Sequence, residues 1–139
     1  MCQIAEMKIE DYDLLIKLWQ SDPGIGISKA DEKLNLSAFL DKNRGLNFIA
    51  VINNDIIGTI LCGNDGRRGY LYHVFVLPEF RKKNIGKKLV YTCIEKLKEE
   101  HITKCHAMIF NHNITGKTFW EKIGFKFRED IGIMSTDLG

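Results

Sequence analysis

The chain has 139 residues, of which 45% are hydrophobic, 10% aromatic and 27% charged, with a formal net charge of +2. This composition is typical of a folded globular protein and excludes the disordered and fibrous classes. No apolar run approaches the ~20 residues that a membrane-spanning helix needs, and the N-terminus lacks the pattern of a signal peptide. We therefore expect one compact domain over residues 1–139, located in the cytoplasm and without a membrane partner.

The four cysteines and the small net charge exclude several kinds of site. Cys2, Cys62, Cys93 and Cys105 form no CxxC pair and have no histidines at zinc-ligand spacing. The sequence therefore predicts neither a metal site nor a disulfide framework, and we expect reduced, mostly buried thiols. A net charge of +2 is also too small to predict nucleic-acid binding by the whole surface.

The first half of the chain shows the patterns of a strand, two helices and a hairpin. Apolar residues between 14 and 19 recur at helical spacing, and the Asp-Pro-Gly cluster at 22–24 ends that helix. An Asn-Asn-Asp turn at 53–55 tolerates positive φ and separates two antiparallel strands. In chain order the expected elements are a strand over 2–6, a helix that ends near residue 22, a helix over 33–42 followed by Gly45, and strands over 48–52 and 56–62.

The second half predicts alternating strands and helices. Pro78 terminates an apolar strand over 70–77, because proline cannot donate to a sheet ladder. From Ile85, apolar residues follow helical spacing to about residue 99. The remaining elements are a strand over 105–110, a short helix over 115–122 and a C-terminal strand or hairpin over 125–138. This order predicts an α/β fold.

A basic loop, R-K-K-N-I-G from Arg81 to Gly86, connects the strand over 70–77 to the helix, and Lys87 and Lys88 lie just inside that helix. Unpaired backbone N–H groups and the positive end of the helix dipole meet there, an arrangement that binds phosphates. Cations at a helix N-terminus oppose the dipole, which favours a bound polyanion that neutralises them. The alternative is a solvated basic turn.

Two segments resemble the signature motifs of the GNAT acetyltransferases. The run VLPEFRKKNIGKKL at 76–89 is similar to motif A, V-x-P-x-x-R/Q-x-x-G-x-G/A, except that Asn84 stands where the first glycine is usual. The run NITGKTFWEKIGF at 113–125 is similar to motif B, and the two motifs occur in the family's order and separation. Because Asn tolerates left-handed φ better than other non-glycine residues, we expect the loop still to form.

The resemblance implies a single domain of the GNAT type, with a mixed, mostly antiparallel sheet of six to seven strands and about four helices. It also implies that the strands over 70–77 and 105–110 are parallel neighbours that splay apart and admit the pantetheine arm of acetyl-CoA, the cosubstrate. Many relatives dimerise through their C-terminal strands, which makes a homodimer a candidate assembly. The residues implied to bind acetyl-CoA are Phe75, Val76, Leu77, Arg81, Lys82, Lys83, Asn84, Ile85, Gly86, Lys87, Asn113 and Trp120.

For the reaction, the resemblance implies direct attack of a primary amine on the thioester, with an N–H near Val76 stabilising the oxyanion. The family usually protonates the departing thiolate with a tyrosine, but Trp120 occupies that position here. Either the thiolate leaves unaided, since a thiol pKa lies near ~8.5, or another donor acts. A packing role for Trp120 is an equally good interpretation.

Tyr70 and Tyr72 occupy the region where the family often has its general base, and strand alternation puts both on one face. A phenol is a weak base at neutral pH, so each fits the anchoring of a water chain better than direct proton transfer. His73 is expected on the opposite face as a hydrogen-bonded core histidine. No spacing assigns a role to His106 or His112.

The family builds its acceptor site largely from the first two helices and the loop that connects them. The candidate partners of a cationic amine are Asp22, Asp31 and Glu32, and Trp19 and Ile25 are candidates for a wall of the site. The same residues are equally consistent with ordinary surface and core.

The leading hypothesis is acetyl transfer to the primary amine of a small molecule, peptide or protein, protein N-termini included. The alternative is a non-catalytic module that binds or senses acetyl-CoA, which the presence of Trp120 keeps open. A nucleic-acid binder that uses Arg67, Arg68 and the loop over 81–88 is disfavoured, because exposed aromatic residues do not alternate with the basic ones.

Overall fold

The computed structural model describes all residues from 1 to 139 and contains two compact units. The first unit, Met1–Met108, holds the sheet and is called the sheet unit below. The second, Ile109–Gly139, is called the C-terminal unit. No helix of the chain combines the length and the apolar character needed to cross a membrane.

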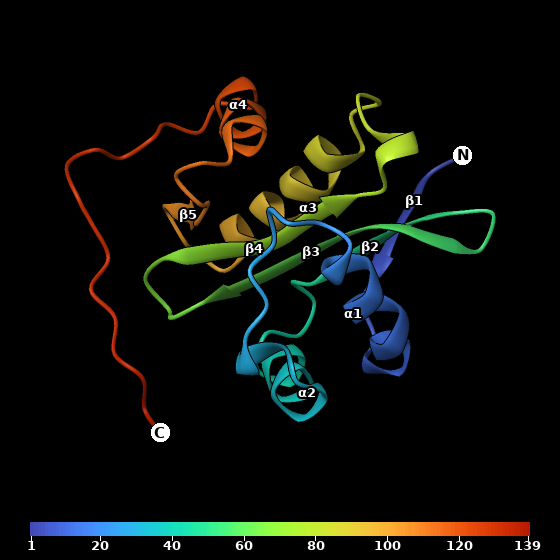
Figure 1. Cartoon of the computed structure of the whole chain (residues 1–139), viewed down its shortest axis with the longest axis horizontal. Helices are drawn as coiled ribbons and strands as arrows, with labels where there is room; N and C mark the ends of the chain where they lie inside the picture. Colours follow the sequence, from blue (N-terminus) through green and yellow to red (C-terminus); the bar gives the residue numbers. More distant parts are fainter. The chain divides into compact units, whose positions relative to one another are not determined.

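The sheet unit is built on a five-stranded sheet in the order β1-β2-β3-β4-β5 (Figure 1). The four strands β1 to β4 pair antiparallel, and β5 pairs parallel to β4, so the mixed sheet with a parallel pair is confirmed. The sequence-based strand count of six to seven was too high. The strands are β1 (Gln3–Glu6), β2 (Phe48–Ile52), β3 (Asp55–Asn64), β4 (Gly69–Val76) and β5 (Cys105–Ala107).

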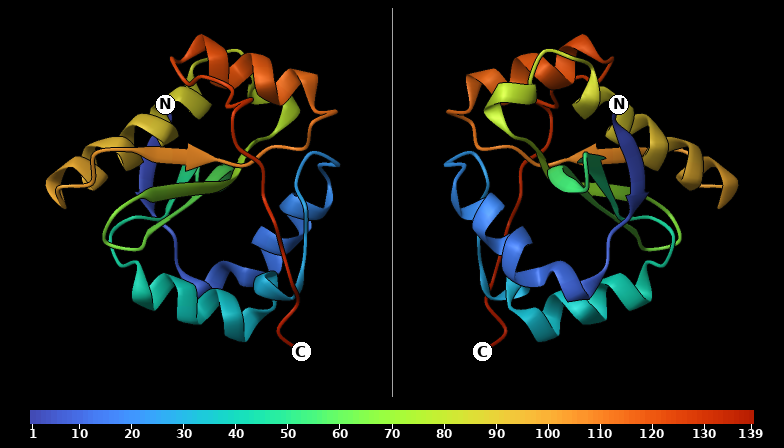
Figure 2. Two further views of the ribbon diagram at one scale, coloured as in Figure 1. Left: turned by 90° about the vertical axis from the view of Figure 1, so that its left-hand side faces the viewer. Right: turned by 90° about the vertical axis from the view of Figure 1, so that its right-hand side faces the viewer.

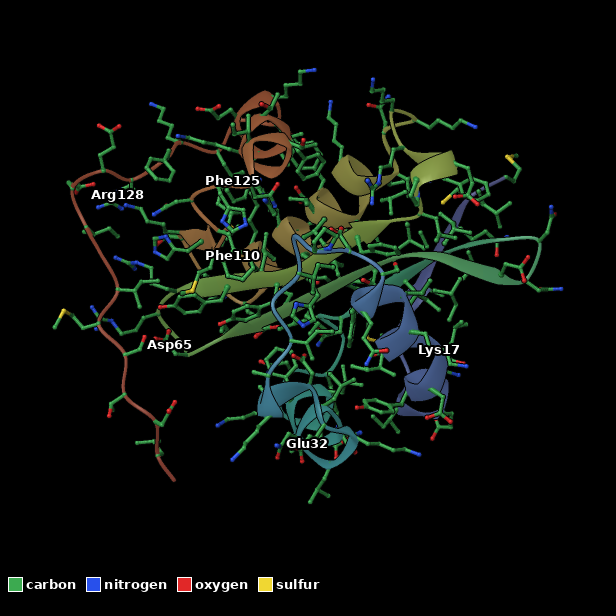
Figure 3. All side chains as sticks on the ribbon, viewed as in Figure 1. Lys17, Glu32, Asp65, Phe110, Phe125 and Arg128 are labelled. Carbon is green, nitrogen blue, oxygen red and sulfur yellow. The ribbon has the colours of Figure 1, made fainter.

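Helices cover both faces of this sheet. Figure 2 shows α1 (Tyr12–Gln20) and α2 (Lys33–Lys42) on one face and α3 (Ile85–Glu99) on the other. Lys17 of α1 and Glu32, the residue before α2, are exposed and point away from the sheet (Figure 3). Three short 3-10 turns, η1 (Ile9–Asp11), η2 (Lys29–Asp31) and η3 (Pro78–Phe80), lie in the connections.

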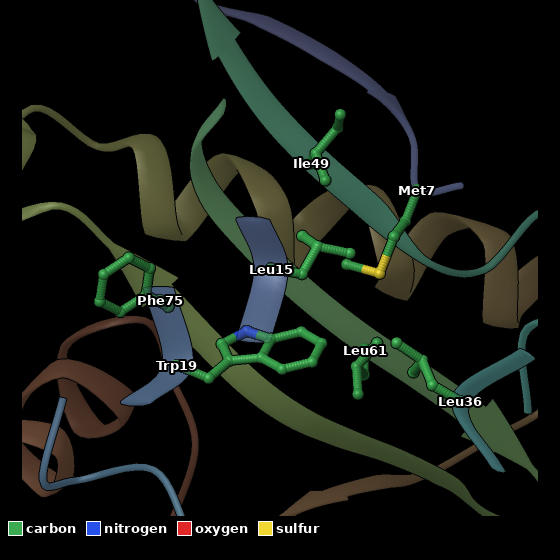
Figure 4. Packing of buried hydrophobic residues seen from close by; sticks show 7 residues of the cluster. All are labelled: Met7, Leu15, Trp19, Leu36, Ile49, Leu61 and Phe75. Carbon is green, nitrogen blue, oxygen red and sulfur yellow. The ribbon is translucent and has the colours of Figure 1, made fainter. Parts of the chain in front are cut away.

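The core between the sheet and the first two helices centres on Trp19, whose side chain is fully buried. Figure 4 shows the indole among apolar side chains from α1, α2, strands β2 to β4 and the segment after β1. Burial of such apolar surface is the main favourable term in folding. The cluster consists of Met7, Leu15, Trp19, Leu36, Ile49, Leu61 and Phe75, and the buried residues of α3 on the other face are Ile85, Leu89, Val90, Cys93 and Leu97.

Several turns form as their residue types predict. Asn53 and Asn54 in the β2–β3 turn have φ of 50° and 66°, and Gly45 after α2 has φ of 77°. These are left-handed conformations that asparagine and glycine tolerate. Of the four cysteines, Cys62 and Cys93 are buried and Cys2 and Cys105 are half-buried.

A bulge in β4 changes which side chains share a face. Leu61 pairs with Tyr72 but Thr59 pairs with Phe75, so β4 has one residue more than β3 over this stretch. His73 absorbs the extra residue in a left-handed conformation, with φ of 51°. Its ring lies 4.7 Å from that of Trp19, on the α1 side of the sheet. The prediction that alternation places His73 on the face opposite Tyr72 was therefore wrong.

Strand β5 is shorter than the sequence suggested. Its pairing with β4 covers only Gly69 to Leu71 opposite Cys105 to Ala107. Beyond that point the two strands no longer exchange hydrogen bonds, so residues 108–110 are not part of a strand, contrary to the prediction for 105–110. The divergence of the two strands stays a prediction.

The C-terminal unit contains one helix, α4 (Ile114–Lys122). Asn113 caps it, because its Oδ1 accepts a hydrogen bond of 2.9 Å from the Gly116 N–H. The predicted strand or hairpin over 125–138 is absent, and this segment has neither helix nor strand. It is an exposed stretch that includes Arg128 (Figure 3). Arg128 Nε lies 2.8 Å from Asp130 Oδ1. The segment has no neighbouring strand in this unit with which to share ladder hydrogen bonds.

Candidate functional site

Within the sheet unit, no strand pairs with the outer edge of β4 beyond Leu71, and this stretch is called the open edge below. The Leu77 N–H donates to the Ile57 carbonyl on the β3 side at 2.8 Å. Because successive N–H groups of a strand point to opposite edges, the Val76 N–H points toward the open edge. The Val76 carbonyl lies on that edge too and accepts a hydrogen bond of 2.7 Å from Arg81 Nε. A free backbone N–H at a strand edge is a suitable donor for an extended ligand or an oxyanion.

Arg81 connects the end of β4 to the loop after α1. Besides its bond to Val76, its guanidinium lies 3.7 Å from the Asp22 carboxylate and 5.9 Å from the centre of the Phe75 ring. The Asp22 carboxylate also accepts a hydrogen bond of 2.8 Å from the Gly24 N–H. Arg81 therefore links the end of β4, at Val76, to the loop after α1, at Asp22. Its positive charge is paired with the Asp22 carboxylate.

The loop after Arg81 reaches α3 through two left-handed residues, Lys82 with φ of 62° and Asn84 with φ of 64°. The expectation that Asn84 adopts this conformation in place of glycine is confirmed. The first helical bond runs from the Lys88 N–H to the Asn84 carbonyl. The N–H groups of residues 85–87 consequently have no partner inside the helix.

Positive charge gathers around these N–H groups. Lys82, Lys83, Lys87 and Lys88 are exposed, and the first turn of α3 contains no acidic residue. Ile85 is buried and fixes the start of the helix against the sheet. Unpaired amides, the helix dipole and cations at one place form a site suited to phosphate groups. One face of α3 continues from this loop as a shallow groove of about 500 Å³, lined by Asn84, Lys87, Lys88, Tyr91, Thr92 and Glu95.

A histidine of β4 and an aspartate of η2 form a pair next to Trp19 of α1. His73 Nε2 lies 2.7 Å from Asp31 Oδ1, and both side chains are largely buried. The second carboxylate oxygen accepts a hydrogen bond of 3.0 Å from the Ser28 N–H. Burial raises the pKa of Asp31, but the hydrogen bonds from His73 and Ser28 outweigh it, so its pKa lies below its ordinary value. The sequence did not indicate this pair, because 42 positions separate the two residues.

The residues predicted to form the acceptor site lie in or near the core. Trp19 has no exposed surface, and Ile25 is half-buried against the same cluster. Asp22 and Asp31 already have partners within the chain, Arg81 and His73 respectively. A positive acceptor would therefore compete with the Arg81 guanidinium for Asp22 and with the His73 imidazole for Asp31.

Tyr70 and Tyr72 share a face, as predicted, with ring centres 6.5 Å apart. Tyr72 also contacts Phe39 of α2, and Tyr70 contacts His106 of β5. Burial, followed by the neighbouring Tyr70, raises the pKa of Tyr72 above its ordinary value. A raised pKa makes its phenolate scarcer at neutral pH, which weakens the case for Tyr72 as a general base.

The other predicted site residues, Asn113 and Trp120, belong to the C-terminal unit. There Asn113 caps α4, and the Trp120 ring packs against those of Phe119 and Phe125 at 5.2 and 4.7 Å. An indole N–H is a donor only and does not titrate in the range of a thiol. Both residues thus have a structural role visible within their own unit.

The Asp31–His73 pair should make stability depend on pH at the acid end. Since the pKa of Asp31 is lowered from 3.8, its carboxylate stabilises the fold above pH 3.8, and this contribution is lost as the pH falls through the lower folded value. We expect Asp31→Asn to lower the free energy of unfolding by about 1–2 kcal/mol at pH 6 and by less at pH 3. Urea unfolding at both values measures the difference. Asp13→Asn, on the exposed side of α1, is the control, and equal losses at both pH values would contradict the prediction.

Comparison with known proteins assigns this fold and site to a class. The sequence model of the acetyltransferase (GNAT) family matches residues 12–125. This range contains both the β4 edge and the loop into α3. The chain belongs to the acetyltransferase (GNAT) family.

Individual relatives agree with this assignment. An acetyltransferase of Pectobacterium atrosepticum is 26% identical over 124 residues, which cover 89% of this chain and 87% of the relative. The PaiA N-acetyltransferase of Thermoplasma acidophilum, solved with coenzyme A, has a TM-score of 0.81 at 22% identity, with 95% and 94% of the two chains covered. The aminoglycoside 6'-N-acetyltransferase AAC(6')-IG of Acinetobacter haemolyticus has a TM-score of 0.79 at 16% identity, with 99% of each chain covered. At these identities the two structures show a shared fold.

Proposed function

We propose that this chain is an acetyl-CoA-dependent N-acetyltransferase that transfers acetyl to a primary amine by direct attack on the thioester. The observation that carries the proposal is the open edge of β4, where the Val76 N–H is followed directly by the basic loop and the free amides of α3. A thioester carbonyl and a pyrophosphate need donors of these two kinds. Family membership supports the same activity.

In this proposal each part of acetyl-CoA has its own partners. The backbone of Phe75, Val76 and Leu77 pairs with the pantetheine arm as an added strand does. The amides of residues 84–87 hold the pyrophosphate, and the ammonium groups of Lys82, Lys83 and Lys87 offset its charge. We further propose that Asn113 and Trp120 of the C-terminal unit take part in acetyl-CoA binding and that residues 1–139 form one acetyltransferase domain, since the family match runs across the boundary between the two units.

Acetyl transfer then requires that the amine is positioned at the thioester and that a hydrogen-bond donor stabilises the oxyanion. The amine nitrogen forms a bond to the carbonyl carbon, and the Val76 N–H donates to the oxygen as negative charge develops on it. Collapse of the tetrahedral intermediate breaks the carbon–sulfur bond, and the thiolate leaves with the electron pair. Because thiols ordinarily have a pKa near ~8.5, the thiolate leaves without an acid at the position of Trp120.

The acceptor in this proposal is a primary amine of a small molecule or a peptide. The names of the structural relatives include an enzyme for aminoglycosides, and aminoglycosides therefore belong in a substrate panel. The alternative function is binding or sensing of acetyl-CoA without transfer. It is favoured by the packing of Trp120 between two phenylalanine rings, where a family member usually has a tyrosine.

Release of the CoA thiol from acetyl-CoA, followed with a thiol reagent, tests the function. We expect turnover with at least one member of a panel of polyamines, aminoglycosides and short peptides, and an acetyl-CoA-dependent rise in melting temperature. A rise in melting temperature without turnover on any amine would favour the binding module. If acetyl-CoA neither turns over nor changes the melting temperature, the proposed function is wrong.

A further inference from the structure

The contact between His73 and Asp31 determines which nitrogen of the imidazole carries a proton. The Asp31 carboxylate is an acceptor at neutral pH, and it faces Nε2 at 2.7 Å. Nε2 must therefore bear the hydrogen and donate it. In the neutral ring the lone pair is then on Nδ1, the arrangement that a proton acceptor requires.

Nδ1 is free to receive a proton. The hydrogen bond of the ring is made through Nε2, and Nδ1 has no partner within the chain. No buried side-chain nitrogen or oxygen of the chain lacks a hydrogen-bond partner. Because Nδ1 has no such partner, it must be reached by solvent. This agrees with the 13% of the His73 side chain that is exposed.

The ring is held in place on several sides. It packs edge-to-face with the Trp19 ring, with ring planes at 64°. The Trp19 Nε1 donates to Thr59 Oγ1 at 2.8 Å, and the Thr59 hydroxyl donates to the His73 carbonyl at 2.8 Å. The left-handed φ of 51° costs energy for a non-glycine residue, and such conformations concentrate at functional sites. This geometry preorganises the imidazole.

The position of His73 along β4 suits a role at the open edge. It lies beyond the last pairing with β5 and three residues before Val76. Three extended residues span ~10 Å, and the bulge shortens that distance. The gap to be bridged runs from His73 to an amine that attacks a thioester carbonyl held by the Val76 N–H. The length of the imidazole side chain and one or two waters is enough to bridge it.

We propose that His73 is the general base of the acetyl transfer and that Asp31 is its positioning residue. His73 Nδ1 accepts one proton from the ammonium group, directly or through water. The amine then forms the C–N bond and the C–S bond breaks. The second proton that the nitrogen loses neutralises the thiolate, and the imidazolium returns its proton to solvent. The inference rests on the proposed acetyltransferase activity.

Chemical rescue tests this role. We expect His73→Ala to lower kcat/KM for the best amine of the panel by about 10²–10⁴-fold, with the acetyl-CoA-dependent rise in melting temperature retained. Added imidazole should restore part of the activity, and substituted imidazoles should restore it in the order of their basicity. A structural role would not produce that order. Asp31→Asn should lower kcat by at least about tenfold and should not respond to imidazole.

His101→Asn is the matched control, because His101 is an exposed histidine with φ of 64°, a conformation that asparagine tolerates. It should keep wild-type activity with and without imidazole. If wild type turns over and folded His73→Ala keeps its rate, or loses it without any rescue, the base assignment is overturned while the acetyltransferase function stands. If wild type transfers acetyl to no amine, both proposals fall together.

Discussion

Replacing Gly86 with glutamate should abolish acetyl-CoA binding and leave the fold intact. Gly86 is the second residue of α3, next to the amides proposed to hold the pyrophosphate. A carboxylate there repels the phosphates, and we expect the dissociation constant for acetyl-CoA to rise at least about 100-fold, which is ~2.7 kcal/mol. Because an acidic residue in the first turn complements the helix dipole, by roughly 0.3–1 kcal/mol, the variant should remain folded. Isothermal titration with acetyl-CoA and urea unfolding measure the two effects.

Lys96→Gln changes the net charge by the same amount at the opposite end of α3. It should bind acetyl-CoA as wild type does, because Lys96 lies ten residues after Gly86, which is about three turns or ~15 Å along the helix. If both variants weaken binding equally, the effect comes from net charge, and the proposed pyrophosphate site is wrong.

Trp19→Ala should cause the largest loss of stability of any change considered. The indole is fully buried between α1 and the sheet, and its Nε1 donates to Thr59 at 2.8 Å. Truncation of a buried tryptophan typically costs about 3–5 kcal/mol, because packing is lost and a cavity remains. Trp19→Phe keeps much of the volume but leaves Thr59 without its donor, so we expect a smaller loss of about 1–3 kcal/mol.

Urea unfolding at neutral pH measures these losses, with Leu34→Ala as the control. Leu34 is 83% exposed on α2 and its truncation should change stability by less than about 0.5 kcal/mol. If Trp19→Ala is as stable as Leu34→Ala, Trp19 is not the centre of the core between the sheet and the first two helices. Folded Trp19→Phe should also show reduced turnover, since the indole contacts the ring of His73.

The local patterns of the chain were sufficient to predict most of its elements. Apolar spacing indicated α1, α2 and α3, and Pro78 marked the end of β4, since periodicity and proline act through neighbouring residues only. Asn84 was expected to replace a glycine, and its left-handed φ follows from the tolerance of its short polar side chain. The basic loop before α3 could be predicted as well, because its residues follow one another in the sequence.

Contacts between distant segments could not be predicted in this way. The bulge in β4 depends on how β3 and β4 pair, so alternation alone placed His73 on the wrong face. The length of β5 and the missing C-terminal strand depend on whether a neighbouring strand is available to share hydrogen bonds.

The sequence by itself therefore determined the class of fold, the basic loop and the family resemblance, all of which reside in short contiguous patterns. Only the tertiary structure decided that His73 faces Asp31 and that Arg81 joins Asp22 to the end of β4. Each of these pairs joins residues far apart in the chain. Their meeting depends on the register of the sheet and on the packing of α1 and α2 against it, which no local propensity specifies.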